Sequence, residues 1–142
     1  MKLSKNFTMD EMCRTSTGYI NVPNVPERIA LKQLVDNLLQ PLREMYGKPI
    51  RVNSGYRSPL VNKAIGGAPL SQHVKGQAAD ITGGSAQENE ILFNLIRDNF
   101  TFDQLIDEFG YSWIHVSYTS GVNRREVLRA TKQGKKIKYV RL

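Results

Sequence analysis

The chain has 142 residues, the length of one ordinary domain, and 40% of them are hydrophobic, which is enough to form a buried core. Charged residues make up 23%, and no stretch approaches the roughly 18 apolar residues of a membrane-spanning helix. These values exclude a disordered chain and a membrane span. We therefore expect a single domain over residues 1–142.

The formal net charge of +7 is concentrated at one end of the chain. The segment 124–142 contains eight lysines and arginines and one acidic residue, and the charges of the remaining residues balance. A basic excess confined to one segment does not indicate that the whole domain binds nucleic acid. This basic C-terminal segment is either a solvated strand or frayed end, or a surface that attracts an anionic partner.

The single cysteine bears on disulfides and structural metals, and the N-terminal residues bear on where the chain is made. Cys13 cannot form an internal disulfide, and no cysteine pair is present that could ligate a structural metal. The first residues lead into polar sequence without the apolar block of a signal peptide. We therefore expect synthesis in the cytoplasm.

Capping residues and a 3.6-residue periodicity predict four helices in chain order. A capping box at Thr8–Glu11 begins a short helix, and the apolar stripe over Glu27–Tyr46 is the strongest helical pattern. Pro41 lies inside that stripe and removes a backbone donor, so we expect a kink there. Ser58 and Pro59 begin a brief helix, and a second capping box at Ser85–Glu88 begins the last one.

Short apolar segments predict four strands: Ile50–Asn53, Ala78–Thr82, Phe102–Phe109 and Trp113–Tyr118. The last two flank Gly110-Tyr111, a sequence suited to a hairpin turn. Helices come mostly before strands. The pattern therefore predicts an α+β fold with a small antiparallel sheet and flanking helices.

The two histidines of the chain, His73 and His115, are candidates for metal ligands together with Asp80. Two imidazoles and a carboxylate suit a zinc site with an open fourth position for water. Their spacing alone leaves an alternative, in which one histidine lies on the surface and the other in the core.

The longer pattern around these residues resembles a known family. The motif Ser-x-His-x-x-Gly-x-Ala-x-Asp spans Ser71–Asp80, Trp-x-His follows at Trp113–His115, and Ser-Gly-Tyr-Arg-Ser precedes at Ser54–Ser58. Over about Val22–Tyr118 the chain resembles the zinc D-alanyl-D-alanine carboxypeptidases and dipeptidases and the phage L-alanyl-D-glutamate endolysins. These peptidases cut peptidoglycan stem peptides and share a fold with the Hedgehog signalling domain.

The resemblance implies roles for five residues. His73, Asp80 and His115 would ligate zinc. Arg57 would face the substrate and polarise its carbonyl or hold its carboxylate, for which a planar, permanently charged guanidinium is suited; the alternative is a surface salt bridge. Ser71 would hydrogen-bond the substrate, or it caps a turn.

The sequence departs from the family at the general base. Ser112 stands three residues before His115, where an acidic residue is common, and a serine cannot accept the proton of the attacking water. Asp107 and Glu108 are the nearest carboxylates. A two-residue type II′ loop pairs Glu108 with Trp113 and directs Glu108 to the His115 face, with Phe109 on the opposite, apolar face, whereas a three-residue loop directs Asp107 there. We favour Glu108.

The resemblance therefore predicts a zinc peptidase that hydrolyses peptidoglycan stem peptides, with metal-activated water as the nucleophile. Its substrate lies outside the membrane, so we expect release onto the cell wall, as in phage or prophage lysis, with the basic C-terminal segment attracted to the anionic wall. Two other functions are open: an inactive, zinc-stabilised binding module, suggested by Ser112, and a nucleic-acid binder acting through the basic segment. The motifs do not distinguish carboxypeptidase from endopeptidase action, nor the oligomeric state.

Overall fold

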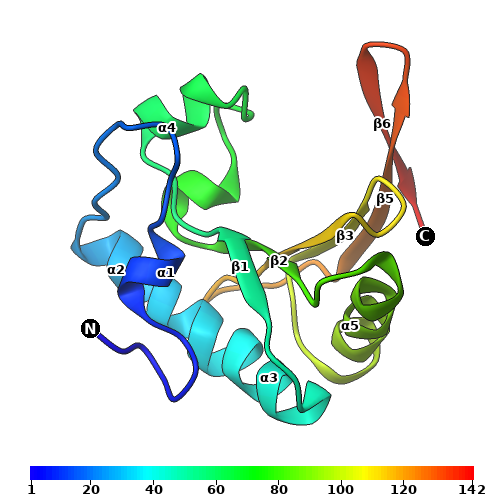
Figure 1. Ribbon diagram of the computed structural model, residues 1–142, viewed down its shortest axis with the longest axis horizontal. Helices are drawn as coiled ribbons and strands as arrows, with labels where there is room; N and C mark the ends of the chain where they lie inside the picture. The colour runs from blue at the N-terminus through cyan, green and yellow to red at the C-terminus, as the bar shows by residue number, and fades with distance from the viewer.

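The computed structural model describes residues 1–142 and contains a six-stranded sheet with helices around it (Figure 1). The helical elements are α1 (Met9–Met12), α2 (Val25–Leu34), the π-helical turn η1 (Val35–Leu39), α3 (Gln40–Tyr46), α4 (Pro59–Ala64), the 3₁₀ turn η2 (Gln72–Lys75) and α5 (Ala86–Asn99). The strands are β1 (Arg51–Ser54), β2 (Ala78–Thr82), β3 (Gln104–Glu108), β4 (Trp113–Ser117), β5 (Glu126–Gln133) and β6 (Lys136–Arg141). No helix is both long and apolar enough to cross a bilayer.

The predicted α+β class is confirmed, but the expectation of a purely antiparallel sheet is wrong. The strand order is β1-β2-β4-β3-β5-β6, and β5 runs parallel to β3 while every other neighbouring pair is antiparallel. The chain leaves β4 at Ser117 and re-enters beside β3 at Glu126, so it adds β5 in the direction of β3. The sheet is therefore mixed, and it includes the basic C-terminal segment.

The sheet has one apolar face and one polar face because side chains alternate along each strand. Its apolar face packs against α2, η1, α3 and α5; in Figure 1, α3 and α5 lie below the sheet and α4 lies above it. The sheet residues in this core are Val52, Ala79, Ile81, Leu105, Ile114 and Val116. The residues between them in the strands face the opposite side, which leaves that side free to carry polar chemistry.

The long helical stripe forms as predicted, with one change of geometry in the middle. Asn24 and Glu27 make a complete capping box at the start of α2, two residues before the predicted start of the helix. The chain then widens into the π turn η1 immediately before Pro41, which has no N–H to donate. The helix ends at Gly47, whose φ of 77° lies in the left-handed region.

The basic C-terminal segment is a β-hairpin, and many of its cations have structural partners. Arg124, Arg129 and Arg141 form ion pairs with Asp103, Asp107 and Glu126, respectively. The Arg125 guanidinium donates to two backbone carbonyls and lies over the Phe102 ring. Most of these arginines therefore attach the hairpin to the domain, so the segment is a pair of strands, and its attraction to an anionic partner stays a prediction.

Truncation tests how far the sheet depends on the hairpin. A chain ending at Asn123 loses β5, leaves the β3 edge unpaired and deprives the buried Asp103 and Asp107 carboxylates of their arginines, so we expect it to unfold or aggregate. A chain ending at Gly134 keeps β5 and should fold. Thermal unfolding followed by circular dichroism checks both; a cooperative transition at the parental temperature for the shorter chain would show that the hairpin is dispensable.

Candidate metal centre and active site

His73 is held in place from three directions. Ser71 caps the 3₁₀ turn η2 by accepting the His73 N–H, and Gly76 closes the turn with a φ of 73° that favours glycine. The His73 Nδ1 lies 2.7 Å from the Gly55 carbonyl oxygen, which makes Nδ1 the protonated nitrogen. The other ring nitrogen, Nε2, is buried and has no hydrogen-bond partner. The lone pair of this buried nitrogen is therefore free to bind a metal ion.

Strand register brings Asp80 and His115 to the same place. Asp80 in β2 pairs directly with His115 in β4, so both side chains project from the polar face of the sheet. Asp80 Oδ1 lies 3.1 Å from His115 Nδ1 and 3.3 Å from His73 Nε2. The sequence-predicted ligands, which are separated by up to 42 positions in the chain, are thus within one cluster.

The cluster fits a zinc ion. One ligand atom each from His73, Asp80 and His115 lies within 4.8 Å of the others. Ligands about 2.0–2.1 Å from a tetrahedral zinc are separated by about 3.3 Å, which is close to the two spacings given above. Two nitrogens and one oxygen are donors that zinc prefers, and three protein ligands leave one position open. These three residues would therefore hold the metal.

Arg57 holds the second oxygen of Asp80. Its Nη2 donates to Asp80 Oδ2 over 3.0 Å, its Nε donates to Ser54 and its Nη1 to Asn62. Burial alone would raise the pKa of the Asp80 carboxyl, but the two histidines hold that pKa well below its usual range. Burial also lowers the pKa of Arg57, against the opposing pull of Asp80 and Glu108. Asp80 is therefore ionised and oriented, as a ligand must be.

The β3–β4 turn sends Glu108 and Asp107 in opposite directions. Glu108 pairs with Trp113, as the hairpin register predicts, and so shares the polar face with His115. Asp107 is buried on the other face, where it accepts the Tyr111 N–H over 2.6 Å and pairs with Arg129. The three-residue loop that would have exchanged the two carboxylates is not present.

The turn itself differs from the predicted two-residue type II′ loop. Four residues, Phe109–Ser112, connect the strands, and Phe109, Gly110 and Tyr111 have φ values of 55°, 67° and 61°. Two backbone hydrogen bonds hold this turn: the Phe109 N–H donates to the Ala130 carbonyl of β5, and the Ser112 N–H donates to the Glu108 carbonyl. Phe109 therefore packs against Trp113 beside the cleft, and its predicted place on the core face is wrong.

Glu108 has the environment of a general base. Burial raises the pKa of its carboxyl to about 7; Asp80 and Asp107 act in the same direction, whereas His115 and Arg57 oppose them. A carboxylate with a pKa near neutrality exchanges protons readily at physiological pH. Ser112 is at the turn, where its hydroxyl donates to the Phe109 carbonyl, so it takes no part in such chemistry.

A cleft of about 670 Å³ contains all of these predicted site residues: Arg57, Ser71, His73, Asp80, Glu108 and His115. One wall is the segment between α4 and η2, and the opposite wall is the C-terminal hairpin. Ser71 lines the cleft and also caps η2, so the cap expected as its alternative role is present. Its proposed contact with substrate stays a prediction.

The sequence analysis missed the residues that the hairpin and its approach contribute to the cleft: Arg124, Leu128, Ile137 and Tyr139. Glu108 pairs with Ala130 and Ala130 with Tyr139, so Tyr139 lies on the polar face of the sheet, two strands from Glu108. A signal was present, because Ile137 and Tyr139 alternate with Lys136 and Lys138 after Gly134, as in an edge strand. The many lysines and arginines of this segment made the alternation difficult to recognise.

A His-Asp-His cluster beside a buried carboxylate in an open cleft is typical of a zinc-dependent hydrolase. Comparison with known proteins agrees: the family model described as Peptidase M15 matches residues 5–117. The chain therefore belongs to the peptidase M15 family. A 48-residue segment is also 50% identical to the zinc D-Ala-D-Ala carboxypeptidase of Streptomyces albus G. That segment covers 33% of this chain and only 19% of the length of that relative.

The cluster predicts the metal content of the protein. Purified protein loaded with zinc should contain about one ion per chain, and His73→Ala or Asp80→Ala should abolish that stoichiometry because two donors do not hold the ion tightly. Atomic absorption after dialysis measures it, with Lys75→Ala, an η2 residue that is not a ligand, as the control. Full zinc retention in both ligand variants would exclude this site.

The burial of Glu108 predicts that the parent and a Glu108→Gln variant differ in stability by an amount that depends on pH. In metal-free protein the folded-state pKa of about 7 exceeds the ordinary 4.5, so the buried charge destabilises the fold as the pH rises through this range. Glu108→Gln should match the parent near pH 4.5 and exceed its free energy of unfolding by on the order of 2 kcal/mol at pH 8. Urea unfolding in the presence of a chelator checks this; a pH-independent difference would contradict the burial of the charge.

Proposed function

We propose that the protein is a zinc peptidase that hydrolyses peptide bonds in peptidoglycan stems. The observation that carries the proposal is the position of Glu108, which shares one face of the sheet with Asp80 and His115 and one cleft with all three ligands. A binding module would need the metal ligands but not a buried carboxylate with a raised pKa beside them.

Each of the residues has a distinct task in hydrolysis. Zinc, when bound by His73, Asp80 and His115, supplies a Lewis acid that polarises a carbonyl and acidifies water. Glu108 accepts the proton of the attacking water and then donates it to the leaving amine, for which its position in the same cleft as the three ligands is suited. Arg57 orients Asp80 and also lines the cleft. There its positive charge stabilises the negative charge that develops on the carbonyl oxygen of the substrate.

The name of the relative supports the choice of substrate. The Streptomyces albus G protein is a zinc D-Ala-D-Ala carboxypeptidase, and the D-Ala-D-Ala sequence occurs in peptidoglycan stem peptides. We propose the same class of substrate here, cut either at the terminal residue or within the stem, and action on the cell wall after release, as in phage or prophage lysis.

The direct test is mass spectrometry of purified muropeptides incubated with the protein. We expect loss of one defined peptide fragment with zinc and no change with a chelator, and the mass lost identifies the bond. Intact muropeptides under both conditions, with zinc bound, would favour the zinc-stabilised binding module that Ser112 suggested. Nucleic-acid binding has less support, because several tail cations already have protein partners.

The two neighbouring carboxylates give a matched pair of variants. Glu108→Gln should keep zinc and the fold but lose about 100- to 10,000-fold in rate, since a general base contributes that much. Asp107→Asn should change the rate little, although it weakens the pair with Arg129 and lowers the melting temperature. Rates on one stem peptide, measured well below the melting temperature, check both. The opposite ranking would assign the base to Asp107, and equal rates would remove both residues from the mechanism.

A further inference from the structure

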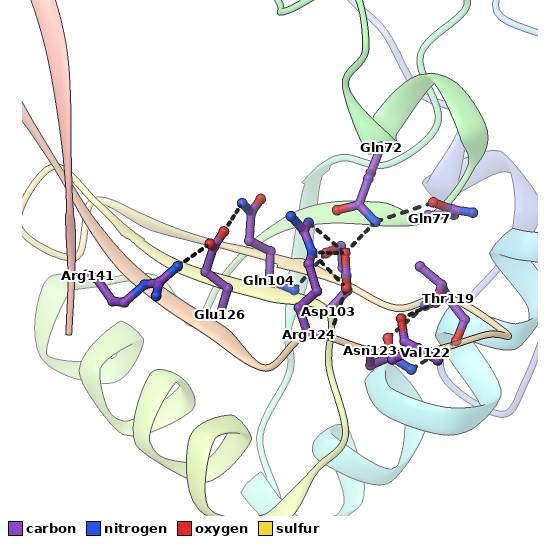
Figure 2. A network of polar contacts seen from close by, with 11 residues as sticks. Gln72, Gln77, Asp103, Gln104, Thr119, Val122, Asn123, Arg124, Glu126 and Arg141 are labelled. Atoms are coloured by element: carbon purple, nitrogen blue, oxygen red, sulfur yellow. Dashed lines mark hydrogen bonds and ion pairs between the residues drawn. The ribbon is translucent and has the colours of Figure 1, made fainter.

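One end of the cleft contains an arginine, Arg124, that lies beyond the residues that the family model matches. That match ends at residue 117, whereas Arg124 lies at the entry to β5 and lines the cleft together with Gln72 and Gln104. Figure 2 shows Gln72, Asp103 and Arg124 meeting where η2 approaches the start of β3 and β5. This end of the cleft therefore differs chemically from the end formed by Phe109, Trp113, Ile137 and Tyr139.

Asp103 holds the Arg124 guanidinium in one orientation. Arg124 Nε lies 3.1 and 3.2 Å from the two oxygens of Asp103, and Nη2 lies 2.8 Å from Oδ2. Asp103 is buried and also accepts the Arg124 backbone N–H and the Gln72 side-chain amide. The Arg124 side chain nevertheless stays 56% exposed. A buried carboxylate thus fixes a guanidinium that faces solvent.

One edge of this guanidinium is free. No hydrogen bond to Arg124 Nη1 is present in the structure, whereas each of the three nitrogens of Arg57 donates to a protein atom. A guanidinium forms its strongest hydrogen bonds with carboxylates, and one whose orientation is already fixed loses little entropy on binding. Of the two arginines that line the cleft, Arg124 is therefore the better placed to bind an anion.

We propose that Arg124 binds a carboxylate of the substrate and thereby selects which peptides are cut. The inference rests on the proposed peptidase function and assigns this chain a specificity residue beyond the matched family region. Gln72, which donates to Asp103, directly precedes the ligand His73 in η2, so the Asp103–Arg124 pair is connected to the turn that carries a metal ligand. The bound carboxylate is either the C-terminal carboxylate of the peptide, which implies carboxypeptidase action, or an acidic side chain, which implies cleavage within the stem.

The variants must separate recognition from folding. Arg124→Gln alone would leave the buried Asp103 without its cation, so the double variant Asp103→Asn/Arg124→Gln replaces the pair by neutral groups. Arg125→Gln is the matched control, because Arg125 is the next residue, has a guanidinium that is also held by the domain, through two backbone carbonyls, and does not line the cleft. Zinc content and melting temperature are measured first for all of them.

The substrates are four synthetic stem peptides ending in D-Ala-D-Ala, with the C-terminus free or amidated and one acidic side chain present or replaced by its amide. On the fully acidic peptide we expect the two Arg124 variants to raise KM about 10- to 100-fold with little change in kcat, as for the loss of a charged hydrogen bond. The amidation that removes this difference identifies the carboxylate that Arg124 binds. Arg125→Gln should behave as the parent.

Measurements of binding and of turnover distinguish a failure of the Arg124 proposal from a failure of the proposed peptidase function. Calorimetric affinities for the same peptides, measured in a Glu108→Gln background, require no hydrolysis and test Arg124 even when the parent proves inactive. Equal losses on acidic and amidated peptides, or an equal effect of Arg125→Gln, overturn the proposal for Arg124 and leave the peptidase function intact. Absence of turnover in the parent overturns the peptidase function, while a carboxylate-dependent affinity would still support Arg124.

Discussion

The Asp80 carboxylate is the group around which this structure is arranged. It is buried in β2 between Ala79 and Ile81, where an isolated anion would be strongly destabilising. Its two oxygens are divided between partners: Oδ1 faces the two histidines and Oδ2 accepts from Arg57. The parts of the chain that supply these partners, η2, β4 and the segment after β1, must therefore converge on β2. Such a division leaves one oxygen oriented for a metal and the other neutralised by the protein.

Several details of the fold serve this convergence. The register between β1 and β2 shifts after Val52, so that Ser54 lies opposite Asp80 and the chain continues into Gly55 and Arg57. Gly55 packs so closely on the Met12 backbone that a side chain could not be accommodated, which fixes the carbonyl that His73 contacts. On the other side of the sheet, alternation within β3 separates Glu108 in the cleft from Asp107 in the core.

Local patterns were sufficient to predict much of this arrangement. Capping residues located α1, α4 and α5, and the register of Glu108 with Trp113 followed from a single hairpin. The ligand set came from the motif of a known family, because spacing alone does not show that His73 and His115 meet. The parallel pairing of β5 with β3 could not be predicted, since it depends on contacts distant in the sequence and on a strand only partly apolar. The shape of the Phe109–Ser112 turn and the cleft wall containing Arg124 depend on that strand, so they could not be predicted either.

The central claim is that His73, Asp80 and His115 hold one zinc ion beside Glu108. Anomalous diffraction at the zinc absorption edge, from crystals grown with zinc, tests this most directly because it locates the metal independently of activity. The account predicts one strong peak at about 2.0–2.2 Å from His73 Nε2, Asp80 Oδ1 and His115 Nδ1, with the fourth position open toward the cleft. A peak at other residues, or none between these three atoms in zinc-saturated crystals, would contradict it.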